Sequence, residues 1–169
     1  MTEDVPLLAG EVLGYRAWRL GEDGELRSYV AVHPDARTVW APGVVVARCR
    51  HGHDAPDASC TCGLHACYEP PEPCRDGGFG RNFGVYGAVV AWGAIDTTST
   101  DFRAQYARVV CLAFWRMQTW HHTEQIRKLA RRYGVRCVEL DELVDVARAY
   151  ADEIPPHLRG HSPVPPPAS

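Results

Sequence analysis

Cysteine and histidine are concentrated in residues 49–74, and this stretch constrains the fold of the chain more than any other. Five of the seven cysteines fall within it, together with three histidines. These side chains are Cys49, Cys60, Cys62, Cys67 and Cys74, and His51, His53 and His65. Clustered cysteines in a reducing compartment indicate metal binding rather than disulfides. The stretch therefore predicts a metal-bound loop between two halves of a β-rich domain.

The spacing within this stretch predicts a set of zinc ligands. Zinc prefers four ligands in a tetrahedron, usually supplied by two short chelating segments. Cys49 and His53 form the first segment, and Cys60 and Cys62 form the second. Gly63 would let the backbone turn tightly after the second segment. The alternative ligands are His51 (in place of His53), His65, Cys67 and Cys74.

Other chemistries remain open for the same residues. The second segment is C-x-C rather than the more familiar C-x2-C. An iron–sulfur cluster needs three or four thiolates, often with C-x2-C spacing. Reduced, partly buried thiols that bind no metal are also common. If zinc binds four protein ligands the site is closed and structural, whereas a catalytic zinc needs an open position.

Length, charge and apolar runs limit the class of protein. A chain of 169 residues, 46% of them hydrophobic, can form one domain with a sizeable core. The net charge of −3 gives no overall attraction to nucleic acid or membranes. The acidic N-terminus does not match a signal peptide, and no apolar run approaches the roughly 20 residues of a membrane span. We therefore expect a cytoplasmic protein with no membrane partner.

Alternating apolar residues and turn signals predict strands in the first two thirds of the chain. The expected strands cover residues 11–20, 26–33, 39–40, 44–49, 83–95 and 102–114. The strand at 44–49 is largely apolar and could be buried on both faces. Residues 69–80 are rich in proline and glycine, which predicts an irregular segment.

The last third predicts a helix, a strand and a second helix. Thr123 is expected to cap the first helix, which ends at Gly134. Residues 135–140 predict a short strand. Asp141 is expected to cap a second helix, whose apolar stripe runs to Ile154.

These elements predict an α+β fold, with a curved antiparallel β-sheet or small barrel followed by a helix–strand–helix unit. Residues 1–10 are expected to be a lead-in to a single zinc-stabilised domain at 11–156. The proline-rich tail at 157–169 is expected to be disordered.

Basic residues are concentrated between residues 102 and 136, where eight arginine or lysine side chains accompany one acid, Glu124. Cations interleaved with aromatic rings are typical of single-stranded nucleic acid binding. The candidate contacts are Arg116, Arg127, Lys128, Arg131 and Arg132. The same side chains could instead form a solvated helix face, or pair with the acidic residues between 139 and 153.

Enzymatic activity has weaker support in the sequence. The chain has no H-E-x-x-H, G-x-S-x-G or phosphate-loop motif. Cys67 beside His65 could act as a nucleophile. Arg16 and Arg103, each followed by alanine in an expected strand, could be buried anchors or ligand clamps.

Several segments between residues 10 and 140 carry a resemblance to a protein group. They are Gly14–Arg19, Trp40–Gly43, Ala55–Pro56, Cys60–Ala66, Gly87–Gly93, Phe102–Ala104 and Leu129–Val135. Together they resemble small, uncharacterised actinobacterial and actinophage proteins with a C-x-C-G-[IL]-x-A motif. That group has no assigned activity, so the resemblance implies a coherent fold and a metal but no reaction. His65 stands where an aromatic residue is usual, and Cys67 and Cys74 are additional to the pattern.

We therefore expect a non-enzymatic, zinc-stabilised binding or adaptor module whose partner is a protein or nucleic acid. One variant is nucleic-acid binding in a regulatory or phage-related setting. The alternative is a small metal- or thiol-dependent enzyme that uses an open zinc site or a reactive cysteine.

Overall fold

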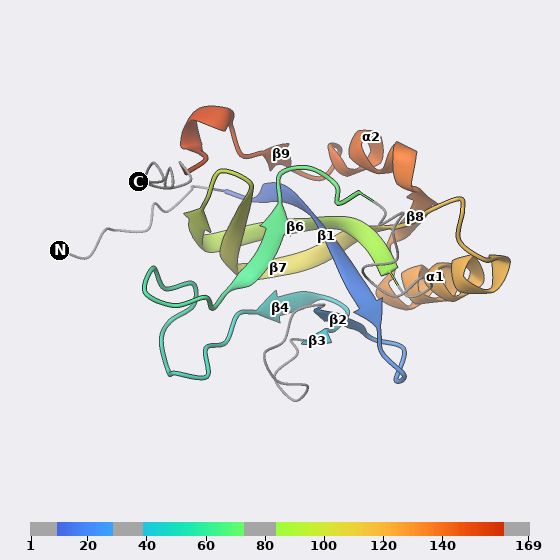
Figure 1. The fold of residues 1–169 in the computed structure, drawn as a ribbon, viewed down its shortest axis with the longest axis horizontal. Helices are drawn as coiled ribbons and strands as arrows, with labels where there is room; N and C mark the ends of the chain where they lie inside the picture. The colour runs from blue at the N-terminus through green and yellow to red at the C-terminus, as the bar shows by residue number, and fades with distance from the viewer. Residues whose placement is uncertain (1–9, 29–38, 73–83, 161–169) are drawn as a thin grey trace, which may run out of the picture.

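Nine strands and two short α-helices make up the described part of the chain. The computed structural model describes residues 10–28, 39–72 and 84–160, and within them the strands belong to one sheet (Figure 1). The strands are β1 (Val12–Leu20), β2 (Leu26–Ser28), β3 (Val39–Trp40), β4 (Val44–Val46), β5 (Leu64–Cys67), β6 (Gly84–Thr97), β7 (Asp101–Phe114), β8 (Arg136–Glu139) and β9 (Asp152–Glu153). The helices are α1 (Trp120–Tyr133) and α2 (Leu143–Ala147), with single 3-10 turns η2 (Leu140–Glu142) and η3 (Pro156–Leu158). This mixture confirms the predicted α+β class.

Three long strands form the centre of the sheet. β6 pairs antiparallel with β1 on one side and with β7 on the other. The outer edge of β1 pairs in turn with β9, β5 and β2, and the outer edge of β7 pairs with β5, β4 and β8. β5 contacts both outer edges, so β1, β6, β7 and β5 form a ring. The pairing of β5 with β1 consists of Tyr15 opposite Cys67.

Apolar side chains are buried on both faces of the sheet. The first core is built around Trp18, Trp40 and Phe102 and includes Ile126 of α1. The second core contains Tyr15 of β1 and is covered by side chains of α2, including Leu143. β8 lies between the two helices in the view of Figure 1, with α1 and α2 on either side of it. The β8 strand confirms the short strand expected at 135–140, and it pairs in parallel with β7.

The strands around the cysteine-rich stretch differ from the prediction. β4 covers only Val44–Val46, and the expectation of burial on both faces is wrong, because Val44 is 57% and Val46 is 48% exposed while Val45 is buried. β4 lies on an edge and buries a single face. β5 was not predicted, although Leu64 and Ala66 alternate with His65 and Cys67 in the manner of a half-buried strand.

The helix boundaries also differ from the prediction. α1 is capped by Thr119, whose side chain accepts a hydrogen bond from the backbone N–H of His122, so the expected cap at Thr123 is wrong. The expected end at Gly134 is confirmed, because this residue adopts a left-handed φ of 66°. The second helix stops at Ala147 and does not reach Ile154. Instead, Asp152–Glu153 pairs with β1, which directs Ile154 into the first core.

Some predicted segments fall partly outside the described residues. The second half of the expected strand at 26–33 and most of the irregular segment at 69–80 lie there. Of the expected tail, residues 157–160 are described: the carbonyl oxygen of Leu158 accepts a hydrogen bond from Thr97, and the guanidinium of Arg159 stacks on the ring of Tyr68. Residues 161–169 are outside the described part.

Candidate metal centre

Four side chains that the sequence predicts as ligands lie together in the structure. The ligand atoms of Cys49, His53, Cys60 and Cys62 are all within 4.8 Å of one another. Cys49 Sγ is 3.7 Å from Cys60 Sγ and 3.7 Å from His53 Nδ1. Sulfur atoms that share one zinc ion at about 2.3 Å in a tetrahedron are about 3.8 Å apart. The cluster is therefore compatible with a zinc ion bound by three thiolates and one imidazole.

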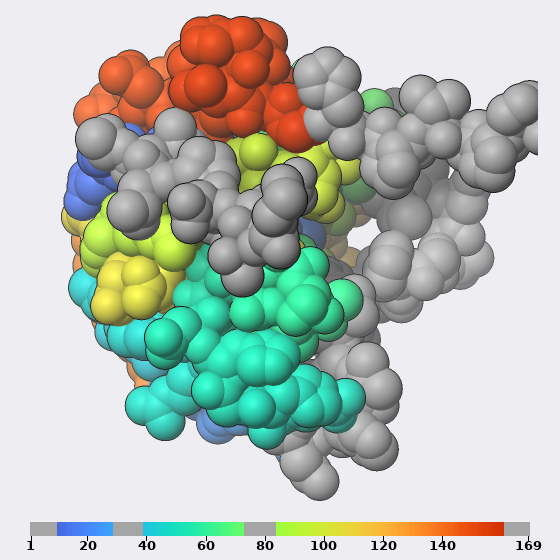
Figure 2. Space-filling model, turned by 90° about the vertical axis from the view of Figure 1, so that its left-hand side faces the viewer, coloured from blue at the N-terminus to red at the C-terminus, as the bar shows by residue number. Residues whose placement is uncertain are grey.

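Both ligand segments belong to the connection between β4 and β5. Cys49 and His53 follow β4, and Gly52 turns the chain between them with a φ of 81°. Cys60 and Cys62 precede β5, and Gly63 adopts a φ of 125° at its start. β4 and β5 pair with successive parts of the same edge of β7, so the connection leaves this edge and returns to it. Figure 2 shows this connection spread over the lower part of one face of the molecule.

Asp57 shapes the chain before the second ligand segment. Its carboxylate accepts hydrogen bonds from the backbone N–H of Ser59 at 2.8 Å and from the Ser59 hydroxyl. Its carbonyl oxygen accepts from the backbone N–H of Cys60 at 3.0 Å. These local bonds form a turn of the kind that aspartate favours. We did not predict this role, although the spacing of Asp57 and Ser59 is a sequence signal for it.

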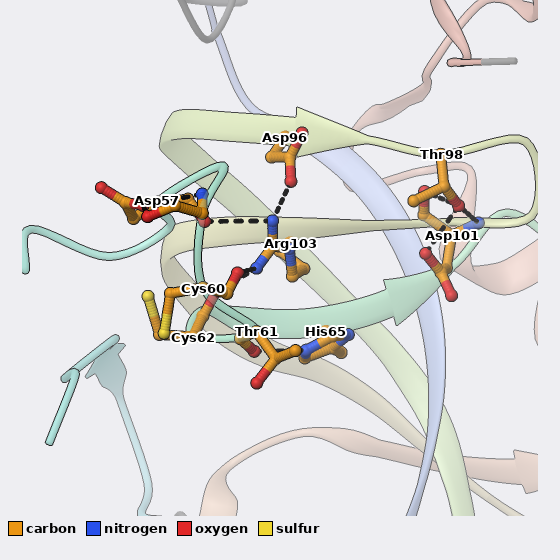
Figure 3. A network of polar contacts seen from close by, with 10 residues as sticks. Asp57, Cys60, Thr61, Cys62, His65, Asp96, Thr98, Asp101 and Arg103 are labelled. Atoms are coloured by element: carbon orange, nitrogen blue, oxygen red, sulfur yellow. Dashed lines mark hydrogen bonds and ion pairs between the residues drawn. The ribbon is translucent and has the colours of Figure 1, made fainter. Parts of the chain in front are cut away.

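Arg103 of β7 fixes the second ligand segment from the other side (Figure 3). Its Nη1 donates to the carbonyl oxygens of Cys60 and Cys62, and its Nη2 donates to that of Asp57 at 3.3 Å. The same Nη2 is ion-paired with the carboxylate of Asp96, which lies opposite Arg103 in the β6–β7 hairpin. Arg103 is only 9% exposed. Of the two roles that the sequence left open for this arginine, the structure shows the buried anchor.

The sulfur atoms of Cys60 and Cys62 lie side by side and point away from Arg103 (Figure 3). Arg103 therefore contacts the backbone of this segment, and the thiols of Cys60 and Cys62 lie on the side of Cys49 and His53. Protein groups therefore hold the backbone of this half of the cluster.

The thiols of the cluster have different electrostatic environments. The backbone N–H of His51 donates to Cys49 Sγ at 3.3 Å and is the main cause that lowers the pKa of the Cys49 thiol. Burial is the main cause that raises the pKa of the Cys62 thiol, and hydrogen bonds with Cys60 and Cys49 also contribute, to a value of about 11. Three thiolates at this distance repel each other unless a cation lies among them. A bound divalent ion would offset this electrostatic repulsion between the thiolates.

The alternative ligands have other surroundings. Nε2 of His51 accepts a hydrogen bond from Arg50 at 3.2 Å, and its backbone N–H contacts Cys49. Nε2 of His65 is 3.2 Å from the carbonyl oxygen of Thr61. Cys67 lies on β5 opposite Tyr15, outside the cluster. Cys74 is outside the described residues. Of the three candidate histidines, His51, His53 and His65, the structure places His53 in the cluster.

Cys67 does not have the environment of a reactive nucleophile. Burial raises the pKa of its thiol, and the nearby carboxylate of Asp101 raises it further. Burial also lowers the pKa of His65, which favours the neutral imidazole. A reactive cysteine needs a thiolate, which a lowered thiol pKa or a neighbouring imidazolium would provide. At neutral pH this pair is therefore a thiol beside a neutral ring.

The five basic residues predicted to contact nucleic acid are all exposed on or near α1. Two of them are engaged within the protein: Arg127 pairs with Glu124, and Arg132 pairs with Glu25 and donates to the carbonyl oxygen of Gly24. Among the described residues, Arg116, Lys128 and Arg131 have no ion pair. The pairing of this helix with the acidic residues at 139–153 is likewise not seen in the described part.

Comparison of the chain with models of protein families, with curated proteins and with solved structures gives no match. The resemblance to small actinobacterial and actinophage proteins therefore stays a prediction. No helix in the described residues is long and apolar enough to cross a membrane.

Proposed function

We propose that this chain is a non-enzymatic binding module of the cytoplasm, stabilised by one zinc ion. The four-residue cluster of Cys49, His53, Cys60 and Cys62 carries the proposal. Three thiolates and one imidazole fill the tetrahedral shell of zinc and leave no position for a substrate or a reactive water. The ion would stabilise the connection between β4 and β5, and thereby the surface that this connection forms.

Metal analysis of the protein tests this proposal. After purification without added metal, we expect about one zinc ion per chain, since structural zinc sites of this ligand type bind tightly at neutral pH. Elemental analysis by mass spectrometry gives the stoichiometry and the identity of the metal. Iron with inorganic sulfide would instead indicate a cluster of the iron–sulfur type, and the absence of metal would contradict the proposal.

The exposed cations of α1 support nucleic acid as a candidate partner of the module. Lys128 and Arg131 are exposed and free of ion pairs among the described residues. The double variant Lys128→Gln/Arg131→Gln is expected to bind a single-stranded oligonucleotide less tightly. Its slope of log affinity against log salt should be shallower by about one to two, because each phosphate contact releases counterions. Fluorescence anisotropy at several salt concentrations measures both quantities.

Arg148→Gln is the control for this experiment, because Arg148 is an exposed cation near α2 and pairs with Glu153. A wild-type protein that does not bind the oligonucleotide, or equal losses in both variants, would remove nucleic acid from the candidates.

A further inference from the structure

A cavity of about 530 Å³ opens beside β1, next to the metal centre. On the outer edge of β1, β5 pairs at Tyr15 and β2 pairs from Trp18 onward, so no described strand pairs with the edge at Arg16. The cavity lies in this gap, and Cys62 of the second ligand segment and the following Gly63 form part of its wall. Its volume falls in the range of sites for small organic molecules.

Arg16 is the main charged group of this cavity. Its Nη1 donates to the carbonyl oxygen of His65, its Nη2 donates to Ser28 Oγ at 2.8 Å, and its guanidinium lies 4.9 Å from the ring centroid of Trp40. Its Nε is buried and has no hydrogen-bond partner among the described residues. Two of its five N–H groups therefore have a protein acceptor there.

No carboxylate of the described residues balances the charge of Arg16. Among the described residues no acidic side chain forms an ion pair with it, whereas Arg103 has Asp96. Burial lowers the pKa of Arg16 to about 10, which leaves the side chain charged at neutral pH. Arg16 is half-buried, and a charge partly removed from water without a counter-ion among the described residues is costly, so this position favours an anion in the cavity.

Ser28 provides a second polar group for the same ligand. Its Oγ accepts hydrogen bonds from Arg16 at 2.8 Å and from Trp40 Nε1 at 3.2 Å. A hydroxyl has two acceptor positions and one hydrogen, so Ser28 can only donate in its remaining bond. Ser28 is buried and lines the cavity. Its hydroxyl therefore suits a ligand that accepts.

The remaining described wall combines apolar surface with a second cation. Leu64, Ala66 and Trp40 supply the apolar part, and Arg48 supplies the cation. The acid in this wall is Asp101, whose carboxylate accepts from Thr98 Oγ1 at 2.8 Å and is not paired with either arginine. The described cavity thus combines positive charge, a hydroxyl donor and apolar surface.

We propose that this cavity binds a small organic anion, in which a carboxylate or phosphate group on an apolar body contacts Arg16 and Ser28. Arg48 would add a second positive charge, and the apolar body would pack on Leu64 and Ala66. The inference rests on the proposed function in that it gives the binding module a ligand, and Cys62 of the second ligand segment lines the same cavity.

Binding of two aromatic anions tests the inference. Benzoate and phenyl phosphate are titrated into the full chain and followed by ligand-observed NMR, with benzamide as the neutral analogue. We expect both anions to bind and benzamide to bind much more weakly. Tighter binding of benzoate would assign a carboxylate ligand, and tighter binding of phenyl phosphate would assign a phosphate ligand.

Arg16→Met is expected to weaken anion binding by about 10- to 100-fold, since a hydrogen bond to a charged group contributes about 1.5–3 kcal/mol. Arg19→Met is the control, because Arg19 is an exposed arginine on the same strand and lies outside the lining. Arg48→Met is the second variant, because Arg48 is exposed and its loss should leave the fold intact while it weakens binding several-fold.

The metal content of every sample is measured in parallel, which separates this inference from the proposed function. Wild-type protein that contains zinc but binds neither anion would overturn the inference and leave the zinc site standing. Equal binding of benzamide, or equal losses in Arg19→Met and the cavity variants, would also overturn it. Anion binding that depends on Arg16 and Arg48 in protein without metal would support the cavity while it contradicts the zinc proposal.

Discussion

Replacement of Cys62 by serine is expected to abolish stoichiometric metal binding and to lower the free energy of unfolding by several kcal/mol. Cys62 is one of four possible ligands whose ligand atoms lie within 4.8 Å of each other, and a serine hydroxyl is a much poorer zinc ligand than a thiolate. Structural zinc sites in small domains contribute binding free energies on the order of 10 kcal/mol, part of which stabilises the fold. Elemental analysis gives the metal content, and urea denaturation gives the free energy of unfolding.

Cys67→Ser is the matched control for this change. Cys67 lies five residues further along the chain, on β5, and is outside the cluster. We expect this variant to keep the metal and most of its stability. If Cys67→Ser loses the metal and Cys62→Ser keeps it, the ligand set proposed from the structure is wrong.

Replacement of Arg103 by methionine is expected to lower the free energy of unfolding by about 3–5 kcal/mol, the usual cost of removing one partner from a buried ion pair. The change leaves the Asp96 carboxylate without its cation and three carbonyl oxygens of the ligand segment without their donor. Metal affinity should fall as well, because Cys60 and Cys62 lose the contacts that fix their backbone.

The control for this prediction is Arg108→Met on the same strand. Arg108 pairs with Glu11 at 3.2 Å, and both side chains are more than 40% exposed. Exposed ion pairs contribute about 0–1 kcal/mol, so this variant should unfold almost as the wild type does. Similar losses in the two variants, measured by urea denaturation, would show that the Arg103 contacts are not a special source of stability.

The four residues of the candidate metal cluster and the long strands could be predicted because their signals are local. Cys49 with His53 and Cys60 with Cys62 are close in sequence, and short chelating segments are how proteins usually supply zinc ligands. The hairpin of β6 and β7 can be recognised in the sequence from two alternating apolar segments with a polar turn between them. The same hairpin register places Asp96 opposite Arg103, so the anchor role of this arginine could also have been inferred.

The parts that sequence reasoning missed depend on distant contacts. The apolar residues from Leu143 to Ile154 have helical spacing, but Leu143 and Ile154 belong to different cores. The helix ends early because β9, just before Ile154, pairs with the edge of β1. β5 has four residues and lies beside the cysteine cluster, where metal ligation was the stronger signal. The cavity at Arg16 is a gap between strands from different parts of the chain and has no local signature.

The division of the outer sheet edges into short strands has a consequence for local unfolding. β2, β4, β5, β8 and β9 each contain two to four residues, so each can detach at the cost of a few hydrogen bonds while its neighbours stay paired. Release of β8 or β9 would expose one edge only. β5 pairs with the outer edges of both β1 and β7, so its detachment would open the ring and the cavity in a single event. This strand is also the one that follows the four candidate metal ligands.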